Sequence, residues 1–497
     1  MNELHFPWLE LAIGLPLLGS FWVRKLKSPE TARIHCIVIT LISFLMTVGA
    51  WIDFSQQSAP TEQDAWAKTL GPGFLEIDQL SAPLMPLTSL LLLLTAVTTL
   101  RTKLKRFSFA ASLVRATVLL AAFACRDPWA VIALLTLSTI LPWLELRSRG
   151  QPTRIFTLHM AVYIIAMVAG QTLVTVTPDH STGEMIGIIL LVLAVLIRSG
   201  MFPFHTWLPD LFQRATFGTA LMFVAPMPGV YLATRLLLPV APDWILRWVA
   251  LISVFTAFYA AGLTLVQKES RRFYSYLFLS QSALVLVGLE LATPIGLTGS
   301  LSLWLSIGLA LGGFGLSLRC VEARLGPFSI TEYRGLYEHM PSLAAFFLLT
   351  GLASVGFPGT FGFIGAELIV EGVVQVYPLV GMVVVICSAL NGIAVLMAYL
   401  RIFTGTHHRT TISLKMLPRE RISVLVLTVL IIGGGIWPQP GIASRFHAAM
   451  QIVNSRRNLS EPAEQAPDHA ERAASPANAR WPTWLTGKQS TDPSHPL

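Results

Sequence analysis

The stretch Arg198-Ser199-Gly200-Met201-Phe202-Pro203-Phe204-His205 lies inside a long apolar run of the kind that forms a membrane helix. Gly200 and Pro203 both oppose helix continuation, because glycine is conformationally free and proline lacks a backbone N–H and clashes with the preceding turn. Broken backbone at membrane depth is stable only where protein or a water-filled cavity surrounds it. The stretch therefore predicts a discontinuous membrane helix in the interior of a bundle.

A second stretch of the same kind, Gly356-Phe357-Pro358-Gly359-Thr360-Phe361-Gly362, interrupts another apolar run. Its helix-breaking residues are Pro358 and Gly359. Matching interruptions in the two halves of a chain are typical of transporters, in which they line the transport path. Two ordinary proline kinks in packed helices are the alternative. For the pair together we favour the transport interpretation.

The composition of the chain as a whole agrees with a membrane protein. Of its 497 residues, 54% are apolar and only 12% are charged, about half the charged fraction of an ordinary soluble domain. This excludes a soluble enzyme with a single core, a disordered scaffold and a nucleic-acid-binding module. The net charge of +8 is attributed to cytoplasmic loops rather than to a nucleic-acid partner.

The apolar runs predict an all-α, polytopic membrane protein of about 14 transmembrane helices. A membrane β-barrel is not expected, because the runs lack ten-residue segments of alternating polarity. The expected spans are 8–22, 34–52, 82–100, 108–125, 128–145, 156–176, 185–202, 216–238, 244–266, 274–293, 298–318, 342–370, 378–403 and 422–437.

Basic residues set the expected orientation. Lys and Arg concentrate in the connections after odd-numbered spans, whereas those after even-numbered spans hold only Lys68, Arg126, Arg235 and Arg247. Because basic loops stay in the cytoplasm, both termini are expected on the non-cytoplasmic side of the cell inner membrane.

The two interruptions fall on spans seven and twelve, which suggests two five-helix repeats of inverted orientation. The expected division is residues 1–107 for helices 1–3, 108–238 for the first repeat (helices 4–8), 239–405 for the second, inverted repeat (helices 9–13), 406–452 for a cytoplasmic loop and helix 14, and 453–497 for a polar, disordered tail.

Four motifs resemble those of the antiporter-like membrane subunits of respiratory complex I, and chain M in particular. The matching stretches are 203–210 (P-F-H-T-W-L-P-D), 268–281 (K-E-S-R-R-F-Y-S-Y…S-Q), 333–341 (Y-R-G-L…M-P) and 356–365 (G-F-P-G-T…G-F-I-G). Relatives of that family include subunits of multisubunit sodium/proton antiporters and of membrane-bound hydrogenases, and the membrane subunits of inorganic-carbon pumps.

The resemblance implies a proton-translocating subunit of a multisubunit complex of the NADH:quinone oxidoreductase type. Its partners would be other membrane and peripheral subunits of a respiratory or transport complex, together with the lipid bilayer, and no nucleic acid. No cofactor, metal site or redox centre is expected in this chain. Whether it is an enzyme is left open, since the resemblance implies at most a subunit of a translocase.

The charged relay that the family implies is depleted here. The position of its glutamate on span five falls near Thr136, and the position of its span-seven lysine is Arg198. Spans eight and eleven offer no ionisable group at the family's positions. Ala366 occupies the place of the acid on span twelve, with Glu367 directly after it. Arginine stays protonated in proteins, so Arg198 is not expected to exchange a proton.

Four residues remain as candidates for the ion pathway: Arg198, His205, Glu367 and Glu371. Arg198 either pins the broken helix by donating to freed carbonyls or binds an anion. His205 either relays protons or caps the helix break. Glu367 is either a titratable group of the path or a carboxylate at the outer mouth of span twelve. Asp78, before span three, is interpreted as structural.

Three functions therefore remain open. The first is the proton-translocating subunit, which we favour. The second is the membrane subunit of an energy-coupled inorganic-carbon transporter, in which Arg198 would serve electrostatics. The third is a scaffold subunit that has kept the fold without conduction.

Overall fold

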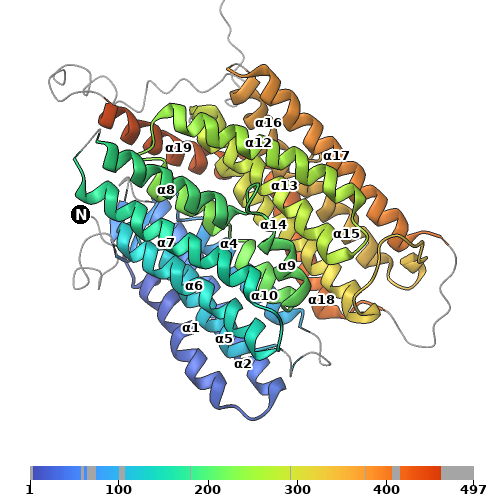
Figure 1. Cartoon of the computed structure of the whole chain (residues 1–497). Coiled ribbons are helices and arrows are strands. Elements are labelled where there is room, and N and C mark those ends of the chain that lie inside the picture. The colour runs from blue at the N-terminus through green and yellow to red at the C-terminus, as the bar shows by residue number, and fades with distance from the viewer. Residues whose placement is uncertain are drawn as a thin grey trace, which may run out of the picture.

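The computed structural model describes residues 4–56, 61–63, 74–99, 104, 107–178, 181–291, 293–374, 376–405 and 415–460. The expected tail lies outside these residues from position 461 onward. Within them the chain is almost entirely helical, apart from the short antiparallel pair β1 (Thr61–Gln63) and β2 (Glu76–Asp78). The helices form an elongated bundle (Figure 1). The expectation of an all-α fold is confirmed.

Each of the fourteen expected spans coincides with a helix or with an interrupted group of helices. The helices before the first interruption are α1 (Trp8–Lys25), α2 (Pro29–Gln56), α4 (Leu84–Val97), α5 (Phe109–Phe123), α6 (Pro128–Ser148), α7 (Arg154–Val176) and α8 (Thr182–Ser199). After it follow α9 (Trp207–Arg214), α10 (Phe217–Val224), α11 (Pro228–Leu232), the π-helical turn η2 (Ala233–Leu237), α12 (Asp243–Val266), α13 (Ser270–Glu290) and α14 (Pro294–Leu325). The last group is the 3₁₀ turn η3 (Leu336–Glu338), α15 (Pro341–Ser354), α16 (Phe361–Val374), α17 (Pro378–Phe403), α18 (Pro418–Ile436) and α19 (Gln439–Ser460).

Local sequence explains where many of these helices begin. The side chains of Ser108, Asp127, Ser181 and Thr216 each accept a hydrogen bond from the backbone N–H three residues ahead, at the starts of α5, α6, α8 and α10. Such caps satisfy amides that have no partner inside the helix. Proline opens α6, α14, α15, α17 and α18, where its missing N–H costs nothing.

The burial pattern is that of a polytopic membrane protein. In the described part of the chain, nine helices are long and apolar enough to span a membrane, or ten if the bent pair α18–α19 counts as one span, and α4, α5 and α15 are shorter apolar helices. The outer helices, such as α2, α12 and α17, present large apolar side chains outward. α13 and α14 lie at the centre, and every residue of α13 from Phe273 to Glu290 is buried.

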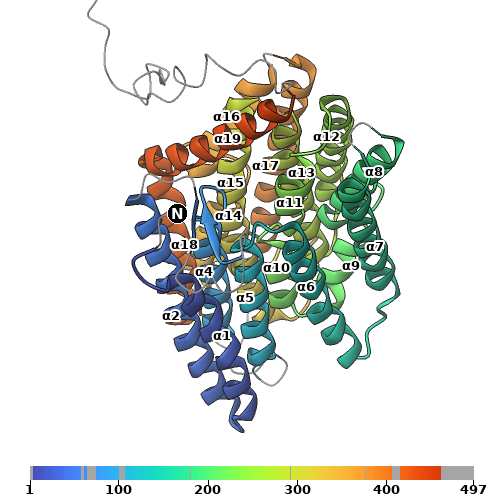
Figure 2. The same ribbon diagram turned by 90° about the vertical axis from the view of Figure 1, so that its left-hand side faces the viewer.

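A helix that the sequence analysis did not predict, α19, closes one end of the bundle. The chain bends by 77° between α18 and α19, so that α19 lies across the bundle end, opposite the α1–α2 connection (Figure 2). The guanidinium of Arg445, which is fully buried, donates to the backbone oxygens of Gln79 and Leu80. We call this end the α19 end and the opposite one the loop end.

Candidate functional site

The first interruption separates α8 from α9. Gly200 takes the left-handed conformation (φ +71°) that ends α8, and the amide of Met201 returns to the oxygen of Leu196 at 2.8 Å. The indole Nε1 of Trp207 donates to the oxygen of Ile197 at 2.9 Å. The amide of Phe202 donates to Oγ1 of Thr256 on α12 at 3.0 Å. Protein groups therefore satisfy much of the backbone that the interruption releases.

A further break, which the sequence analysis did not predict, lies beside the first interruption. The chain between α10 and α11 contains Pro226, and Met227 has a positive φ of 51°. A Cβ atom added at Gly229 would come within 2.3 Å of Oγ of Ser199, so this position must remain glycine for the two broken segments to pack together. The interior around residue 200 thus holds two discontinuous helices.

Arg198 joins these two segments. Its side chain is 3% exposed, and Nη2 donates to the backbone oxygen of Phe223 at 3.1 Å. In a continuous α-helix, the oxygen of Phe223 would accept from the amide of Met227. That amide donates to the oxygen of Val224 instead, so the oxygen of Phe223 is free to accept from Arg198. The guanidinium also lies 4.0 Å from the centre of the Phe223 ring, a cation–π arrangement. These contacts favour the pinning role over an anion site.

His205 lies at the other end of the same turn. It is 8% exposed, and its ring lies beside those of Phe202, Tyr259 and Tyr276, with centroid distances of 6.1, 5.4 and 6.4 Å. The structure therefore places two of the four candidates, Arg198 and His205, at the first interruption. Pro203 lies between them in the turn.

The second interruption, between α15 and α16, lies against the central helix α14. Gly356 and Gly359 adopt positive φ angles of 81° and 85° around Pro358. On α16, a Cβ atom at Gly362 would lie 2.7 Å from Oγ of Ser306, and one at Gly365 would lie 2.8 Å from the amide of Leu303. The glycine-lined side of α16 is thus in direct contact with α14.

Glu367 and Glu371 lie on the opposite side of α16. Both side chains are exposed in the isolated chain, one helical turn apart, and the structure does not bring them together with Arg198 or His205. One residue along a helix rotates a side chain by about 100°. The shift of the acid from position 366 to 367 therefore turns it away from the glycine-lined side.

One carboxylate near the interior was missed by the sequence analysis. Glu145, near the end of α6, accepts hydrogen bonds from the amide of Thr216, at 2.8 Å, and from the hydroxyl of Thr219, both at the start of α10. Arg115 on α5 is 3% exposed and interacts electrostatically with Glu145. The sequence does offer a signal for Glu145, because it is a lone acid in the apolar run L-P-W-L-E-L, nine residues beyond Thr136 on the same helix.

A cavity of about 650 Å³ opens at the loop end, next to Thr216. Its walls carry both signs of charge, including Arg319 and the pair formed by Arg271 and Glu322, in which Nε and Nη2 contact the two carboxylate oxygens at 2.7 and 2.5 Å. Because Thr216 both lines the cavity and contacts Glu145, the cavity leads to the start of α10.

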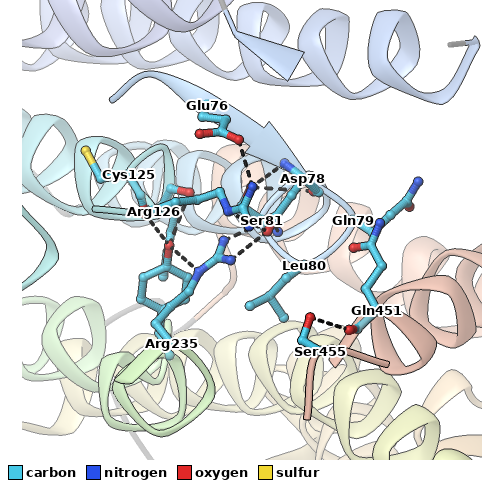
Figure 3. A network of polar contacts seen from close by, with 12 residues as sticks. Glu76, Asp78, Gln79, Leu80, Ser81, Cys125, Arg126, Arg235, Gln451 and Ser455 are labelled. Carbon is cyan, nitrogen blue, oxygen red and sulfur yellow. Dashed lines mark hydrogen bonds and ion pairs between the residues drawn. The ribbon is translucent and has the colours of Figure 1, made fainter. Parts of the chain in front are cut away.

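At the α19 end, a network of ion pairs fixes Asp78 (Figure 3). Its carboxylate accepts from both terminal nitrogens of Arg235 at 2.6 and 3.0 Å, and Arg235 also donates to the hydroxyl of Tyr231. Burial alone would raise the pKa of Asp78, but the charge and hydrogen bonds of Arg235 outweigh it and hold the pKa well below its usual range. These contacts support the interpretation of Asp78 as structural.

The fold and these interruptions define a polytopic α-helical membrane protein with discontinuous helices in its interior. Residues 155–391 match the family model described as NADH:quinone oxidoreductase/Mrp antiporter, transmembrane segment. Over these residues the chain matches the antiporter-like membrane subunits, in agreement with the resemblance of its motifs.

Individual relatives agree with this match. NADH-quinone oxidoreductase subunit M of Rickettsia prowazekii is 30% identical over 266 residues, which cover 52% of this chain and 54% of that relative. The subunit M of Rickettsia bellii is 26% identical over 491 residues, covering 90% of this chain and 98% of that protein.

Solved structures show the same fold. A chain of respiratory complex I from Thermus thermophilus superposes with a TM-score of 0.79 at 22% identity, over 90% of this chain and 99% of that one. A chain of the Mrp complex from Dietzia gives a TM-score of 0.78 at 17% identity, over 91% and 99% of the two chains.

Proposed function

We propose that the chain is a proton-translocating membrane subunit of a multisubunit complex of the NADH:quinone oxidoreductase type. Its named relatives are subunits of such complexes. The observation that carries the proposal is the first interruption, where buried Arg198 joins two broken helices in the protein interior. In many transporters, discontinuous helices at membrane depth form the binding sites for ions and substrates.

Several buried polar atoms support a hydrated interior. Within the described residues, Nε of Arg198, Oγ of Ser199, Nε2 of Gln281 and Oδ1 of Asn391 have no hydrogen-bond partner. Buried polar groups of this kind are usually satisfied by ordered water. Water at these atoms would connect the first interruption to α13 and α17, because Nδ2 of Asn391 donates to Oγ of Ser280 at 2.8 Å.

In this proposal the residues have three roles. Glu145 and the cavity at the loop end receive protons, since a carboxylate beside an aqueous opening can exchange them. Arg198 keeps its charge throughout and sets the local field, because an arginine does not give up its proton. His205 and the hydroxyl of Thr256 flank the path at the interruption.

The exposed carboxylates of α16 support a partner subunit. A carboxylate on a membrane helix is costly against lipid and normally faces protein or water. We therefore place a neighbouring subunit of the complex against Glu367 and Glu371. The cell inner membrane as location, the non-cytoplasmic termini and the two inverted repeats at 108–238 and 239–405 are part of the same proposal.

A scaffold role is the second candidate, and one observation agrees with it. Aromatic rings cover the guanidinium of Arg198, with the Trp207 ring centre at 5.8 Å in addition to that of Phe223. Such packing is compatible with an interior that does not conduct.

Purification of the native complex through a tag on this chain tests the proposal. We expect quinone-reductase subunits to copurify, and sealed vesicles that contain the complex to change their internal pH during turnover. Turnover without a pH change would contradict proton translocation and favour the scaffold. A large zinc-dependent carbonic-anhydrase-like partner, without quinone-reductase subunits, would instead favour the inorganic-carbon transporter.

A further inference from the structure

Glu290, the last residue of α13, differs from the other deeply buried glutamates. Glu322 and Glu420 are 3% and 0% exposed, and each forms a bidentate ion pair, with Arg271 and Arg324 respectively. Glu290 is 2% exposed, and its Oε2 accepts a hydrogen bond from Oγ of Ser253 at 3.0 Å. Among the described residues, its Oε1 has no hydrogen-bond partner.

This arrangement is unfavourable for a purely structural carboxylate. Removing a carboxylate from water without a cation costs several kcal/mol, and a single hydroxyl replaces little of that hydration. At Glu322 and Glu420 an ion pair with arginine offsets this cost of burial. A buried ionisable residue in a membrane protein that lacks such a partner points to a function in the movement of ions.

The surroundings of Glu290 connect it with the first interruption. Its partner Ser253 lies on α12, one helical turn from Thr256, and both hydroxyl-bearing residues are fully buried. Thr256 in turn accepts the amide hydrogen of Phe202 from the interruption. Along the axis of α12, only about 4.5 Å therefore separates Ser253, which binds Glu290, from Thr256, which binds the broken helix.

Glu290 also lies far from the cavity at the loop end. Ser270, the first residue of α13, lines that cavity, and Glu290 is the last residue of the same buried helix. Twenty residues of helix span about 30 Å, which is close to the thickness of the hydrocarbon core of a bilayer. The cavity and the carboxyl thus mark opposite ends of the central helix.

We propose that Glu290 is the carboxyl group that binds and releases the translocated proton near the α19 end of this subunit. A proton from water at the interruption adds to Oε1 and forms a neutral carboxylic acid, and the same O–H bond breaks when the proton leaves toward the α19 end. Ser253 positions the group through Oε2. This assignment rests on the proposed proton translocation and names a residue outside the four original candidates.

Labelling with dicyclohexylcarbodiimide tests the assignment without an activity measurement. The reagent adds a protonated carboxyl across one C=N bond, and the resulting O-acylisourea rearranges to a stable N-acylurea with no leaving group. We expect the intact complex to carry this adduct on Glu290, detected by mass spectrometry of its peptides. Labelling elsewhere in the chain with none at Glu290 would overturn the assignment.

Two substitutions and a matched control complete the test. In vesicles that contain the assembled complex, E290Q should reduce the proton translocation rate at least about tenfold, since an amide cannot exchange a proton. E290D should restore part of the rate. E332Q is the control, because Glu332 is 70% exposed and pairs with Arg334 at the surface, and its rate should equal that of the wild type.

The outcomes separate the two proposals. If wild-type and E290Q complexes translocate protons equally, the assignment of Glu290 is wrong and the proposed function stands. If the wild-type complex turns over without moving protons, the proposed function is wrong. If E290Q does not assemble, labelling of the wild-type complex decides the role of Glu290.

Discussion

The indole Nε1 of Trp304, in the first half of α14, donates a hydrogen bond to the backbone oxygen of Pro226 at 3.2 Å. Pro226 lies in the break between α10 and α11, whereas the neighbouring Leu303 touches Gly365 just after the second interruption. Two adjacent residues of one buried helix therefore contact two separate discontinuous segments of the chain. α14 thus packs against both of these breaks in the chain.

Replacing Trp304 by phenylalanine removes this donor. Because Trp304 is fully buried and Pro226 would lose its partner, we expect W304F to lower the free energy of unfolding by about 1–3 kcal/mol. Equilibrium unfolding in mixed micelles measures the change. The matched control is W248F, since Trp248 is 63% exposed and its replacement should change stability by less than about 0.5 kcal/mol. Equal effects of the two substitutions would contradict a role for the hydrogen bond.

Substitutions at Arg198 separate its charge from its geometry. R198K retains a cation but loses the planar contact with Phe223, whereas R198Q loses the charge. We expect R198K to translocate protons and R198Q to lose translocation, with both variants less stable than the wild type by about 1–3 kcal/mol. Vesicle pH measurements, normalised to the amount of assembled complex, check this. Wild-type translocation by R198Q would show that the path does not depend on the charge.

Glu367 provides a test of the partner surface. Its side chain is exposed on α16, so E367Q should leave the stability of the isolated chain within about 0.5 kcal/mol of wild type. In the complex, the loss of a charge that faces a neighbouring subunit should weaken assembly, measured as the fraction of the chain that migrates in the full complex on native gels. Unchanged assembly would indicate that another surface binds the partner.

The pair of Asp78 and Arg235 predicts a dependence of stability on pH. The pKa of Asp78 in the folded chain lies below its unfolded value of about 3.9. The pair therefore contributes fully above about pH 4 and loses its contribution as the pH falls toward the folded pKa. We expect D78N to destabilise the protein by about 3–5 kcal/mol at pH 7, and the difference from wild type to narrow below pH 4.

The control for this experiment is D243N. Asp243 pairs with Arg456 at 2.7 Å, but its side chain is 73% exposed, so the loss should be below about 1 kcal/mol. A difference between D78N and wild type that does not change between pH 7 and pH 3.5 would contradict the assigned pKa shift.

The membrane helices were predictable because each one appears in the sequence as a long apolar run. The two interruptions were predictable because Pro203 and Pro358 lie inside such runs. The break at Met227 was not predicted, although Pro226 and Pro228 both occur in span eight, because prolines in an apolar run also fit an ordinary kink of a continuous helix. α19 was missed because its composition is polar. Its position depends on tertiary contacts such as those of Arg445.

The candidate site was less predictable than the fold. The sequence indicates that Arg198 lies in a broken helix, but its contact with Phe223, 25 residues further along the chain, depends on the break between α10 and α11. The direction of Glu367 follows from how α16 packs against α14. Glu290 could be recognised only once the structure showed that arginine pairs with other buried carboxylates and not with it.

The internal pH of sealed vesicles that contain the purified complex tests the central claim most directly. During turnover, we expect the internal pH to change steadily and to return to its starting value when a protonophore is added. The same turnover with a constant internal pH, in vesicles shown to be tight to protons, would contradict proton translocation by this chain.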